Sequence, residues 1–416
     1  MDMKMVCLVF VSIWMGMSEA NMTESDLHRR LFKDYLPDVK PHLDKETPLE
    51  VTLNMYLMSI DNINEKRQTI TVRGFMELTW TDDFLVWDKD LYSNISVITV
   101  KDDSIWRPNV ALMDTFGKPT DLGYGGQVIV ESDGLVTVWP YKMYTVSCKI
   151  NIANFPFDKQ TCKFDFASWS SNNKVIALKN LHDKIPTDYL IESGEWETLD
   201  TRVHSSPKSF GKEKYDHIIF TIELKRKSLF HVMNLMIPVL CISLLNVTSF
   251  LLPSEDGERV TLSISVFLTL AVFLTVVNSS MPETSDEVAT FTIYVGLQLF
   301  GSAMTVVLTV VSLGVFHIDE EHKVPKQLKC FVKMCCVRKK KIDQVEQPAP
   351  GTNTTTANGT TPSMKDIFTY RIKMANEQHR VTWKMVSRAM DKFCAIVAVI
   401  WHVLLFASML TSMTQK

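Results

Sequence analysis

The chain has 416 residues, enough for two to three domains, and its 44 basic residues nearly balance 47 acidic ones at a net charge of −3. This balance argues against nucleic-acid binding, which normally shows as a clear excess of Lys and Arg. Apolar residues make up 46% and charged residues 22% of the chain, as in ordinary globular proteins. After Leu229, however, the apolar residues gather into long blocks, so we expect a water-soluble first part followed by a membrane part.

The first twenty residues have the pattern of a secretory signal peptide. A basic residue, Lys4, precedes an apolar run over residues 5–17, and small residues lead to Ala20. The alternative, a membrane span, is disfavoured because this run is too short for a hydrocarbon layer of about 30 Å. We therefore expect residues 1–20 to be removed on export, which makes Asn21 and Asn94, each in an Asn-x-Ser/Thr triplet, candidate glycosylation sites.

Residues 21–227 show the pattern of an extracellular all-β domain. Short alternating runs, such as 68–72 and 218–224, are separated by turn sequences rich in Gly, Asp and Ser. Many short strands over a segment of this length favour an immunoglobulin-like β-sandwich.

Cysteine usage predicts one disulfide in this extracellular domain. Of the eight cysteines, Cys7 leaves with the signal peptide, and only Cys148 and Cys162 remain in the exported part. A lone exported pair is expected to form a disulfide. The others lie in or beyond the apolar blocks: Cys241, Cys330, Cys335, Cys336 and Cys394.

Four apolar blocks are long enough, or nearly so, to cross a bilayer as helices: residues 229–252, 260–277, 290–316 and 393–413. Eight Lys and Arg residues between positions 323 and 341 follow the third block, and such a cluster marks the cytoplasmic side. This topology places residues 21–227 and the C-terminus outside the cell. It divides the chain into a signal peptide, an extracellular domain, three helices in residues 228–316, a cytoplasmic part in 317–392, and a fourth helix with an extracellular end in 393–416.

The cytoplasmic part has two predicted segments. Residues 342–363 are rich in Pro, Thr, Asn and Gly and read as a disordered linker. Residues 364–392 lack Pro and Gly, and we expect them to run as one helix into the fourth span. Cys330, Cys335 and Cys336 lie in the basic segment, where reduced thiols and reversible palmitoylation are both consistent with the sequence. No His or Cys completes a usual metal-ligand spacing there, so no metal site is expected.

The loop between the two exported cysteines resembles a family signature. Cys148, Phe155-Pro156-Phe157-Asp158, Gln160 and Cys162 are similar to the loop of the Cys-loop receptors, the pentameric ligand-gated ion channels. The resemblance runs from about Leu31 to the end of the chain and is nearest to the nicotinic acetylcholine receptor branch. Further matching segments are Trp80-Thr81-Asp82, Trp106-Arg107-Pro108, Gly194-Glu195-Trp196, Asn234 with Pro238, and Gly257-Glu258-Arg259.

This resemblance implies a multi-pass plasma-membrane protein, with a synaptic location among the expectations. It implies identical or homologous subunits arranged as a homopentamer or heteropentamer in membrane lipid, with ligand sites between subunits. The second transmembrane helix of each subunit would line a central pore. No motif for bond chemistry is present, whether His-Glu-x-x-His, Gly-x-x-x-x-Gly-Lys or Gly-x-Ser-x-Gly, so we expect neither an enzyme nor a cofactor.

The second predicted span carries a stripe suited to a pore. Thr261, Ser265, Leu268 and Val272 recur at alternating intervals of four and three residues, a pattern that Thr275 and Ser279 continue, so they share one helix face. Hydroxyl rings would replace part of an ion's hydration shell, and an apolar ring can close the pore by dewetting. Leu268 and Val272 are therefore the predicted gate. The alternative from the pattern alone is an ordinary packed amphipathic helix.

Charge selectivity is predicted from acidic residues before the second span. Five copies of Glu258, with Glu255 and Asp256 nearby, would form a negative ring that attracts Na⁺, K⁺ and, as a further candidate, Ca²⁺. Arg259 opposes this reading unless its long side chain turns away from the axis. Anion-selective relatives carry Pro-Ala before the basic residue, whereas this chain has Gly257-Glu258. At the outer end, Ser279 stands where excitatory relatives often carry an acid.

The resemblance also implies an aromatic ligand site for a small organic cation. Trp169 lies where nicotinic receptors place their central binding Trp, and Tyr215 matches a Tyr of the hairpin before the first span. Phe75 and Trp139 match positions on the neighbouring subunit's face. Strand alternation puts Glu77 on the same face as Phe75, where its carboxylate would attract an amine. The alternative for each aromatic residue is packing in the protein core.

Two positions depart from the nicotinic pattern. Met113 stands where these receptors hold a Tyr, and the hairpin of residues 203–215 lacks an adjacent cysteine pair, leaving Phe210 as its second aromatic residue. The sequence therefore leaves the agonist unnamed, and acetylcholine does not follow from it.

Coupling of ligand binding to the pore is expected at the membrane surface. In the family, the loop between the two cysteines meets the loop of residues 278–287. Phe155, Pro156 and Phe157 would supply apolar contact there, and Arg226 a buried charge. Two alternatives to a ligand-gated cation channel stay open at this stage: a subunit that binds no agonist and needs partner subunits to conduct, and an anion-selective channel.

Overall fold

The computed structural model describes residues 23–115, 117–253, 258–279, 281–282, 288–319, 322–335 and 381–414. The predictions for residues 1–20, Asn21, Glu255, Asp256, Cys336 and the linker 342–363 therefore lie outside the described residues. The chain forms two compact units. The first comprises Met1–Ile152, Pro156–Ser228 and Met281–Glu287, and the second comprises Ala153–Phe155, Leu229–Ser280 and Val288–Lys416.

The first unit starts with a short helix and continues as strands. Helix α2 (Glu24–Phe32) is capped by Thr23 and Asp26, whose side chain accepts a hydrogen bond from the Thr23 backbone. Two short 3₁₀ turns, Lys89–Leu91 and Asp102–Ser104, interrupt the strands. The strands are β1 (Leu49–Asn64), β2 (Thr69–Thr81), β3 (Val97–Lys101), β4 (Val110–Leu112), β5 (Thr120–Asp121), β6 (Gln127–Glu131), β7 (Leu135–Val138), β8 (Tyr141–Ser147), β9 (Lys159–Ser168), β10 (Ile176–Lys179), β11 (Trp196–Ser205), β12 (Lys208–Phe210), β13 (Glu213–Tyr215) and β14 (His217–Arg226).

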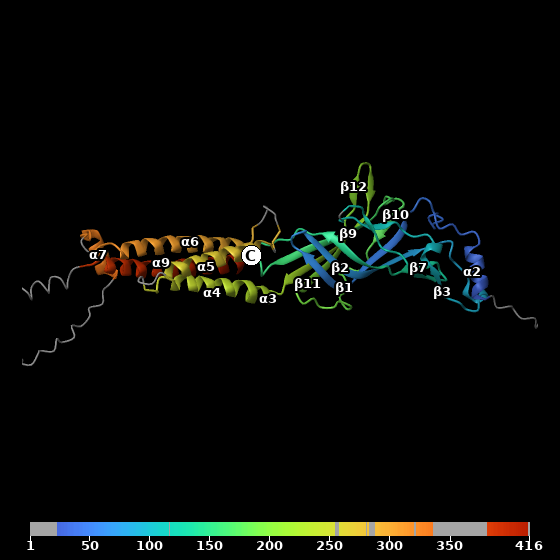
Figure 1. Cartoon of the computed structure of the whole chain (residues 1–416). Helices are drawn as coiled ribbons and strands as arrows, with labels where there is room; N and C mark the ends of the chain where they lie inside the picture. Colours follow the sequence, from blue (N-terminus) through green and yellow to red (C-terminus); the bar gives the residue numbers. More distant parts are fainter. Residues whose placement is uncertain are drawn as a thin grey trace, which may run out of the picture. The chain divides into compact units, whose positions relative to one another are not determined.

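These strands form the predicted sandwich. One sheet has the order β10-β1-β2-β7-β6-β3 with β8 also paired to β2, and the other has the order β11-β14-β9-β4-β5. Their inner faces meet in an apolar core, where the ring of Tyr144 from β8 packs edge-on against Phe166 from β9 at 5.7 Å. Strands β12 and β13 form a separate hairpin that stands out from the two sheets (Figure 1). Strands β1 and β2, at 16 and 13 residues, are longer than the short strands expected.

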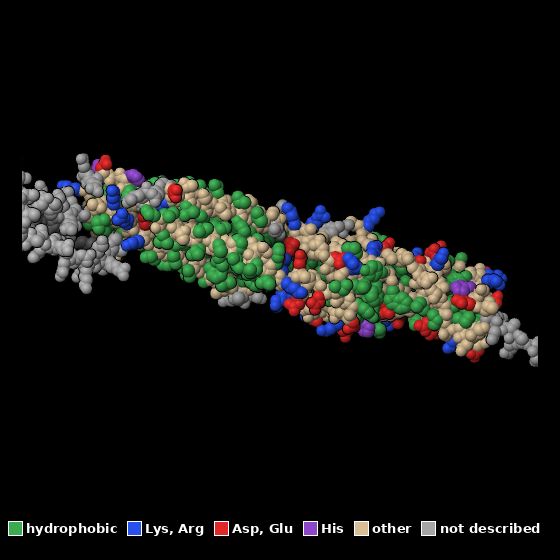
Figure 2. All heavy atoms as spheres, turned by 60° about the horizontal axis from the view of Figure 1, so that its bottom comes forward, with side chains coloured by type: hydrophobic (Ala, Val, Ile, Leu, Met, Phe, Trp, Pro, Cys, Tyr) green, Lys and Arg blue, Asp and Glu red, His purple; other side chains and the backbone are tan. Residues whose placement is uncertain are grey.

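The second unit is helical. Its elements are α3 (Leu229–His231), a π-helical segment (Val232–Met236), α4 (Ile237–Thr248), α5 (Glu258–Ser279), α6 (Thr290–Phe316), α7 (Lys326–Cys335) and α9 (Trp383–Thr414). Among the described residues, four stretches are long and apolar enough to cross a membrane: Leu229–Thr248, Glu258–Ser279, Thr290–Phe316 and Trp383–Met413. On the face in Figure 2, hydrophobic side chains cover much of these helices. Helix α9 begins at Trp383 and passes unbroken through residue 392 into the fourth candidate span, whereas Val381 and Thr382, which we expected in the same helix, are not helical.

The first span differs from its expected form. We predicted a helix over 229–252, but regular helix ends at Thr248, and residues 232–236 are π-helical. Pro238 explains the π-helical segment, because proline lacks an N–H and its ring would collide with the carbonyl of Asn234 in a regular helix. Widening one turn to the π form relieves this conflict. The side-chain amide of Asn234 donates a hydrogen bond to the backbone carbonyl of Phe230 at 2.9 Å.

The interior of the helical unit contains a row of polar residues among apolar ones. A row of buried residues runs along α6 at intervals of four and three: Gln298, Ser302, Thr305, Thr309 and Ser312. Asn246 from α4 lies within hydrogen-bond distance of Thr305 and Ser302, at 3.4 and 3.5 Å, and His402 from α9 contacts Gln298 at 2.5 Å. In lipid, apolar helix faces gain little by meeting one another, so such hydrogen bonds contribute to holding the bundle together.

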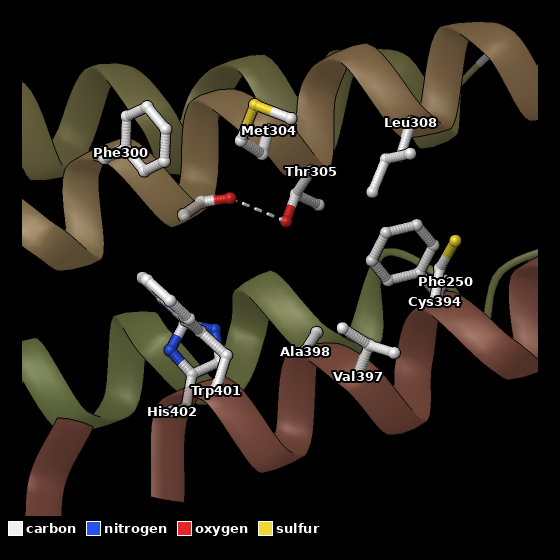
Figure 3. Close-up of a pocket in the computed structure, with 11 residues that line it drawn as sticks. Phe250, Phe300, Met304, Thr305, Leu308, Cys394, Val397, Ala398, Trp401 and His402 are labelled. Atoms are coloured by element: carbon white, nitrogen blue, oxygen red, sulfur yellow. Dashed lines mark hydrogen bonds between the residues drawn. The ribbon is translucent and has the colours of Figure 1, made fainter. Parts of the chain in front are cut away.

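Beside this polar row is an apolar pocket of about 240 Å³. Phe300, Met304 and Leu308 from α6 face Val397 and Trp401 from α9 across it (Figure 3). The Thr305 hydroxyl in its wall donates to the Gly301 carbonyl at 3.1 Å.

Candidate functional site

One group of predicted ligand residues lies on the outward face of the seven-stranded sheet. On β2, the even-numbered neighbours are buried while Phe75 and Glu77 point outward, in agreement with strand alternation. The Glu77 carboxylate accepts hydrogen bonds from Asn54 at 3.1 Å and from the Tyr56 hydroxyl at 3.2 Å. Its other oxygen lies 3.4 Å from the indole nitrogen of Trp139. The structure therefore brings Glu77 and Trp139 together.

Two aromatic residues that we did not predict complete this group. The Tyr56 ring stacks on Phe75 at 4.8 Å, and the Tyr189 ring meets both edge-on at 6.3 and 6.0 Å. Burial and the neighbouring Glu77 carboxylate raise the pKa of Tyr56, so its hydroxyl remains a donor. The position of Tyr56 follows from the β1–β2 register, in which it pairs with Phe75. No sequence pattern would have located Tyr189, which lies in a loop between β10 and β11.

A second group of predicted residues belongs to the other sheet and the hairpin. Trp169 directly follows β9, donates its backbone N–H to the Asn109 carbonyl at 3.0 Å, and is 56% exposed. Met113 donates its backbone N–H to the Asp165 carbonyl at 2.8 Å. On the hairpin, Phe210 is 82% exposed and Tyr215 is half-buried opposite Lys208.

A buried carboxylate holds the hairpin to the sheet beneath these residues. Asp165 on β9 accepts hydrogen bonds from His217 at 2.7 Å and from the ammonium of Lys208 on β12. Burial alone would raise the pKa of Asp165, but the bonds from His217 and Lys208 outweigh it and lower that pKa. Asp165 lies far in the sequence from Lys208 and His217, and the three residues were not predicted to meet.

The two groups do not meet within one chain. Among the described residues, no hydrogen bond or ring contact joins Trp169, Met113, Phe210 or Tyr215 to Phe75, Glu77 or Trp139. Each group is partly exposed, as two halves of a site between subunits would be. That meeting across subunits stays a prediction.

Helix α5 has one buried and one exposed stripe. Arg259, Ser263, Val266, Leu270 and Val277 are buried against the rest of the unit. The predicted pore residues Thr261, Ser265, Leu268 and Val272 are exposed, the last two at 56% and 63%. Ser265 donates to the Thr261 carbonyl at 2.8 Å, so its hydroxyl oxygen stays available as an acceptor. This pattern leaves the predicted pore stripe without a partner inside the described chain.

The basic residue beside the predicted selectivity ring is turned inward. Arg259 is 1% exposed, and its guanidinium donates to both oxygens of Asp391 on α9, at 2.9 and 2.6 Å. The Ser312 hydroxyl also donates to Asp391, at 2.6 Å. Glu258, by contrast, is exposed at the first turn of α5. The positive charge of Arg259 is therefore compensated inside the unit, while Glu258 faces outward.

The Cys148–Cys162 loop and Arg226, which are predicted to couple ligand binding to the pore, are well anchored. Cys148 and Cys162 form the expected disulfide, with Cα atoms 5.3 Å apart. Arg226 is buried and donates to both oxygens of Asp158, at 2.8 and 3.1 Å, and to Glu65 at 2.8 Å. Pro156 is buried and Phe157 is 41% exposed.

In the second unit, Phe155 is buried against two helices. Its ring centroid lies 5.0 Å from that of His231 and 6.5 Å from that of Phe291. The backbone N–H of Thr290, at the start of α6, donates to the carbonyl of Ala153 at 3.0 Å. The residues Ala153–Phe155 thus pack with α3 and with the start of α6.

Comparison with known proteins assigns both units. Residues 24–228 match the neurotransmitter-gated ion-channel ligand binding domain, and residues 235–378 match the neurotransmitter-gated ion-channel transmembrane region. The chain belongs to the neurotransmitter-gated ion channel family, whose members are ligand-gated membrane channels and not enzymes.

Its similar relatives are nicotinic receptor subunits. The neuronal acetylcholine receptor subunit beta-3 of Homo sapiens is 30% identical over 302 residues, which cover 73% of this chain and 66% of that relative. The subunit alpha-9 of Gallus gallus is 32% identical over 304 residues, covering 71% and 62%. The alpha-type subunit acr-16 of Caenorhabditis elegans is 30% identical over 325 residues, covering 77% and 64%. The match therefore spans slightly less than two thirds of each relative's length.

Proposed function

We propose that this chain is a subunit of a pentameric, cation-selective channel of the plasma membrane, opened by a small organic cation that binds between subunits. The observation that carries this proposal is the exposed stripe of α5, which pairs hydroxyl groups with Leu268 and Val272. Charged or strongly polar helices facing lipid are costly, so a stripe of hydroxyls on a span of this kind is best explained by a water-filled pore.

Selectivity for Na⁺ and K⁺ over Cl⁻ is supported by the arrangement at the start of α5. A ring of five Glu258 carboxylates would concentrate cations at the inner mouth. Arg259 would otherwise cancel this charge, but its guanidinium is bound to Asp391 on the other side of the helix. An anion channel is disfavoured for the same reason.

The ligand site is proposed between the two exposed groups of aromatic residues. One subunit would contribute Trp169, Tyr215, Phe210 and Met113, and its neighbour Phe75, Trp139 and Glu77. Ring faces attract organic cations by about 0.5–2 kcal/mol per ring, depending on desolvation. Homopentamer formation is sufficient for this arrangement, because each chain carries both groups.

The proposal is tested by expressing the full chain alone and recording whole-cell currents over a panel of organic cations under a NaCl gradient. With Na⁺ as the permeant cation in both the pipette and the bath, we expect agonist-evoked currents that reverse near the Na⁺ equilibrium potential. Reversal at the Cl⁻ potential would replace the proposal by an anion channel. If the chain reaches the cell surface but conducts no agonist-evoked current until a nicotinic subunit is co-expressed, it is a subunit that needs partners.

A further inference from the structure

Glu77 is a half-buried carboxylate held by neutral groups. Its three hydrogen-bond donors are the Asn54 amide, the Tyr56 hydroxyl and the Trp139 indole. In the part of the chain that the structure describes, no Lys, Arg or His forms an ion pair with it. Asp61 on the same sheet shows the usual alternative, since it is paired with Arg73 at 2.8 Å. Glu77 therefore has no internal counter-ion.

Aromatic side chains lie beside this carboxylate on the outward face of the sheet. Phe75 and Tyr56 stack on each other, and Tyr189 lies edge-on to both. Trp139 and Tyr189 are 42% and 58% exposed, so part of the cluster faces away from the chain's own core. A carboxylate beside partly exposed aromatic side chains is an environment that favours a cation.

The hydrogen bonds of Glu77 show which kind of cation fits. The bond from the Trp139 indole, at 3.4 Å, is long, so that carboxylate oxygen retains most of its capacity to accept another donor. A protonated primary or secondary amine offers N–H donors that can form a charge-assisted hydrogen bond there. A quaternary ammonium has no N–H, so it can gain only from the rings and from unspecific attraction.

We propose that the Glu77 cluster, consisting of Asn54, Tyr56, Phe75, Glu77, Trp139 and Tyr189, binds the protonated amino group of the agonist and selects N–H-bearing amines over quaternary ammonium ions. This rests on the proposed function, because the cluster is one half of the proposed site between subunits. Tyr189 contributes a ring to the cluster, edge-on to both Tyr56 and Phe75, and is expected to strengthen binding of any organic cation there.

The test measures binding to the purified full-length protein by isothermal titration calorimetry. The probes are 2-phenylethylamine and N,N,N-trimethyl-2-phenylethylammonium, which share one ring and one positive charge and differ in the N–H groups. Glu77→Gln keeps the size of the side chain and removes its charge. Asp61→Asn is the matched control, because it removes a carboxylate of the same sheet that is already paired with Arg73.

We expect the wild type to bind 2-phenylethylamine on the order of tenfold more tightly than the trimethyl probe, as one charge-assisted hydrogen bond allows. Glu77→Gln should abolish this preference, and Asp61→Asn should preserve it. Tyr189→Ala should weaken both probes, whereas Tyr189→Phe, which retains the ring, should behave like the wild type.

Three outcomes overturn the proposal: equal affinity of the wild type for both probes, no binding of either probe, or an equal loss for both probes in Glu77→Gln. The last would assign Glu77 a purely structural role in ordering Trp139 and Tyr56. Amine-selective binding without any current in the same protein would instead contradict the proposed channel function and leave the ligand assignment standing.

Discussion

Arg259 and Asp391 lie 132 residues apart in the sequence and form a bidentate ion pair in the interior of the helical unit. The pair joins the start of α5 to α9, and the Ser312 hydroxyl on α6 binds the same carboxylate. Three of the four candidate spans therefore meet at one buried charge. The position of the predicted pore helix depends on a residue of the fourth span that is remote from it in the chain.

Removing one partner of this pair should be severely damaging. Asp391→Ala would leave a buried guanidinium without its counter-charge, which typically costs about 3–5 kcal/mol. We expect few assembled channels, measured as surface-biotinylated protein and as the pentamer fraction on size-exclusion chromatography. The double exchange Arg259→Asp with Asp391→Arg should recover part of the loss. Asp200→Ala, which breaks surface pairs with Lys184 and Arg202, should have little effect. Normal assembly of Asp391→Ala would show that the pair is dispensable.

The stability of the extracellular unit should depend on pH through the Asp82 carboxyl. Burial raises the pKa of this carboxyl to about 6, although hydrogen bonds from the Tyr35 hydroxyl and the Phe84 N–H oppose the shift. A carboxyl whose pKa is raised on folding contributes its full stabilisation at pH values below the pKa of the unfolded state, which is near 3.8. That contribution is lost as the pH rises through about 6.

The melting temperature of the wild type relative to Asp82→Asn should therefore increase as the pH falls from 7.5 to 5. Titrations elsewhere in the unit cancel in this comparison, so differential scanning fluorimetry at several pH values isolates the Asp82 contribution. A difference in melting temperature that stays constant, or narrows on acidification, would mean that the pKa of Asp82 is not raised.

Loss of the Cys148–Cys162 disulfide should reduce surface expression more than loss of a free thiol. Closing a loop of about 15 residues contributes about 3 kcal/mol in the chain-entropy description. Cys148→Ser should therefore reduce surface expression and any agonist response that remains. Cys241→Ser, which replaces a free exposed thiol, is the matched control and should behave like the wild type. Surface channels of Cys148→Ser that gate normally would contradict the coupling role proposed for Phe155, Pro156 and Phe157.

Glu258 should set the preference for cations. Glu258→Ala removes five negative charges from the inner mouth of a pentamer, so its reversal potential under a NaCl gradient should move toward the Cl⁻ potential. Glu258→Asp, which preserves the charge, should keep the wild-type reversal potential. An unchanged reversal potential in Glu258→Ala would mean that Glu255, Asp256 or the cytoplasmic part sets the charge selectivity.

The features that could be predicted from the sequence are those that depend on the residues of one continuous segment or on a residue count. Long apolar blocks located all four spans, and period-two alternation placed Phe75 and Glu77 on one face of β2. The disulfide followed from the location of the cysteines. Each of these signals is contained in a continuous stretch of chain or in a count of residues.

The features that were missed depend on distant contacts. Asp391 lies two residues before the fourth apolar block, beside Lys392, and nothing local identifies its partner as Arg259. The polar row on α6 repeats at intervals of four and three and could have been recognised by the same reasoning as the α5 stripe. Tyr189 lies in an irregular loop, and only the folded chain places it over Phe75. The π-helical turn before Pro238 was likewise hidden, because a hydropathy pattern does not report helix geometry.

The central claim, that the exposed stripe of α5 lines the pore, is tested most directly by comparing Leu268→Thr with Phe267→Ser in whole-cell recordings. A polar ring at Leu268 should favour the hydrated, open pore, and a relative stabilisation of about 1.4 kcal/mol would shift the opening equilibrium tenfold. Leu268 is exposed on the stripe and Phe267 is half-buried beside it. The account predicts current without agonist, or responses at lower agonist concentration, for Leu268→Thr and not for Phe267→Ser. Equal effects at both positions, or no effect of Leu268→Thr in a conducting channel, would contradict it.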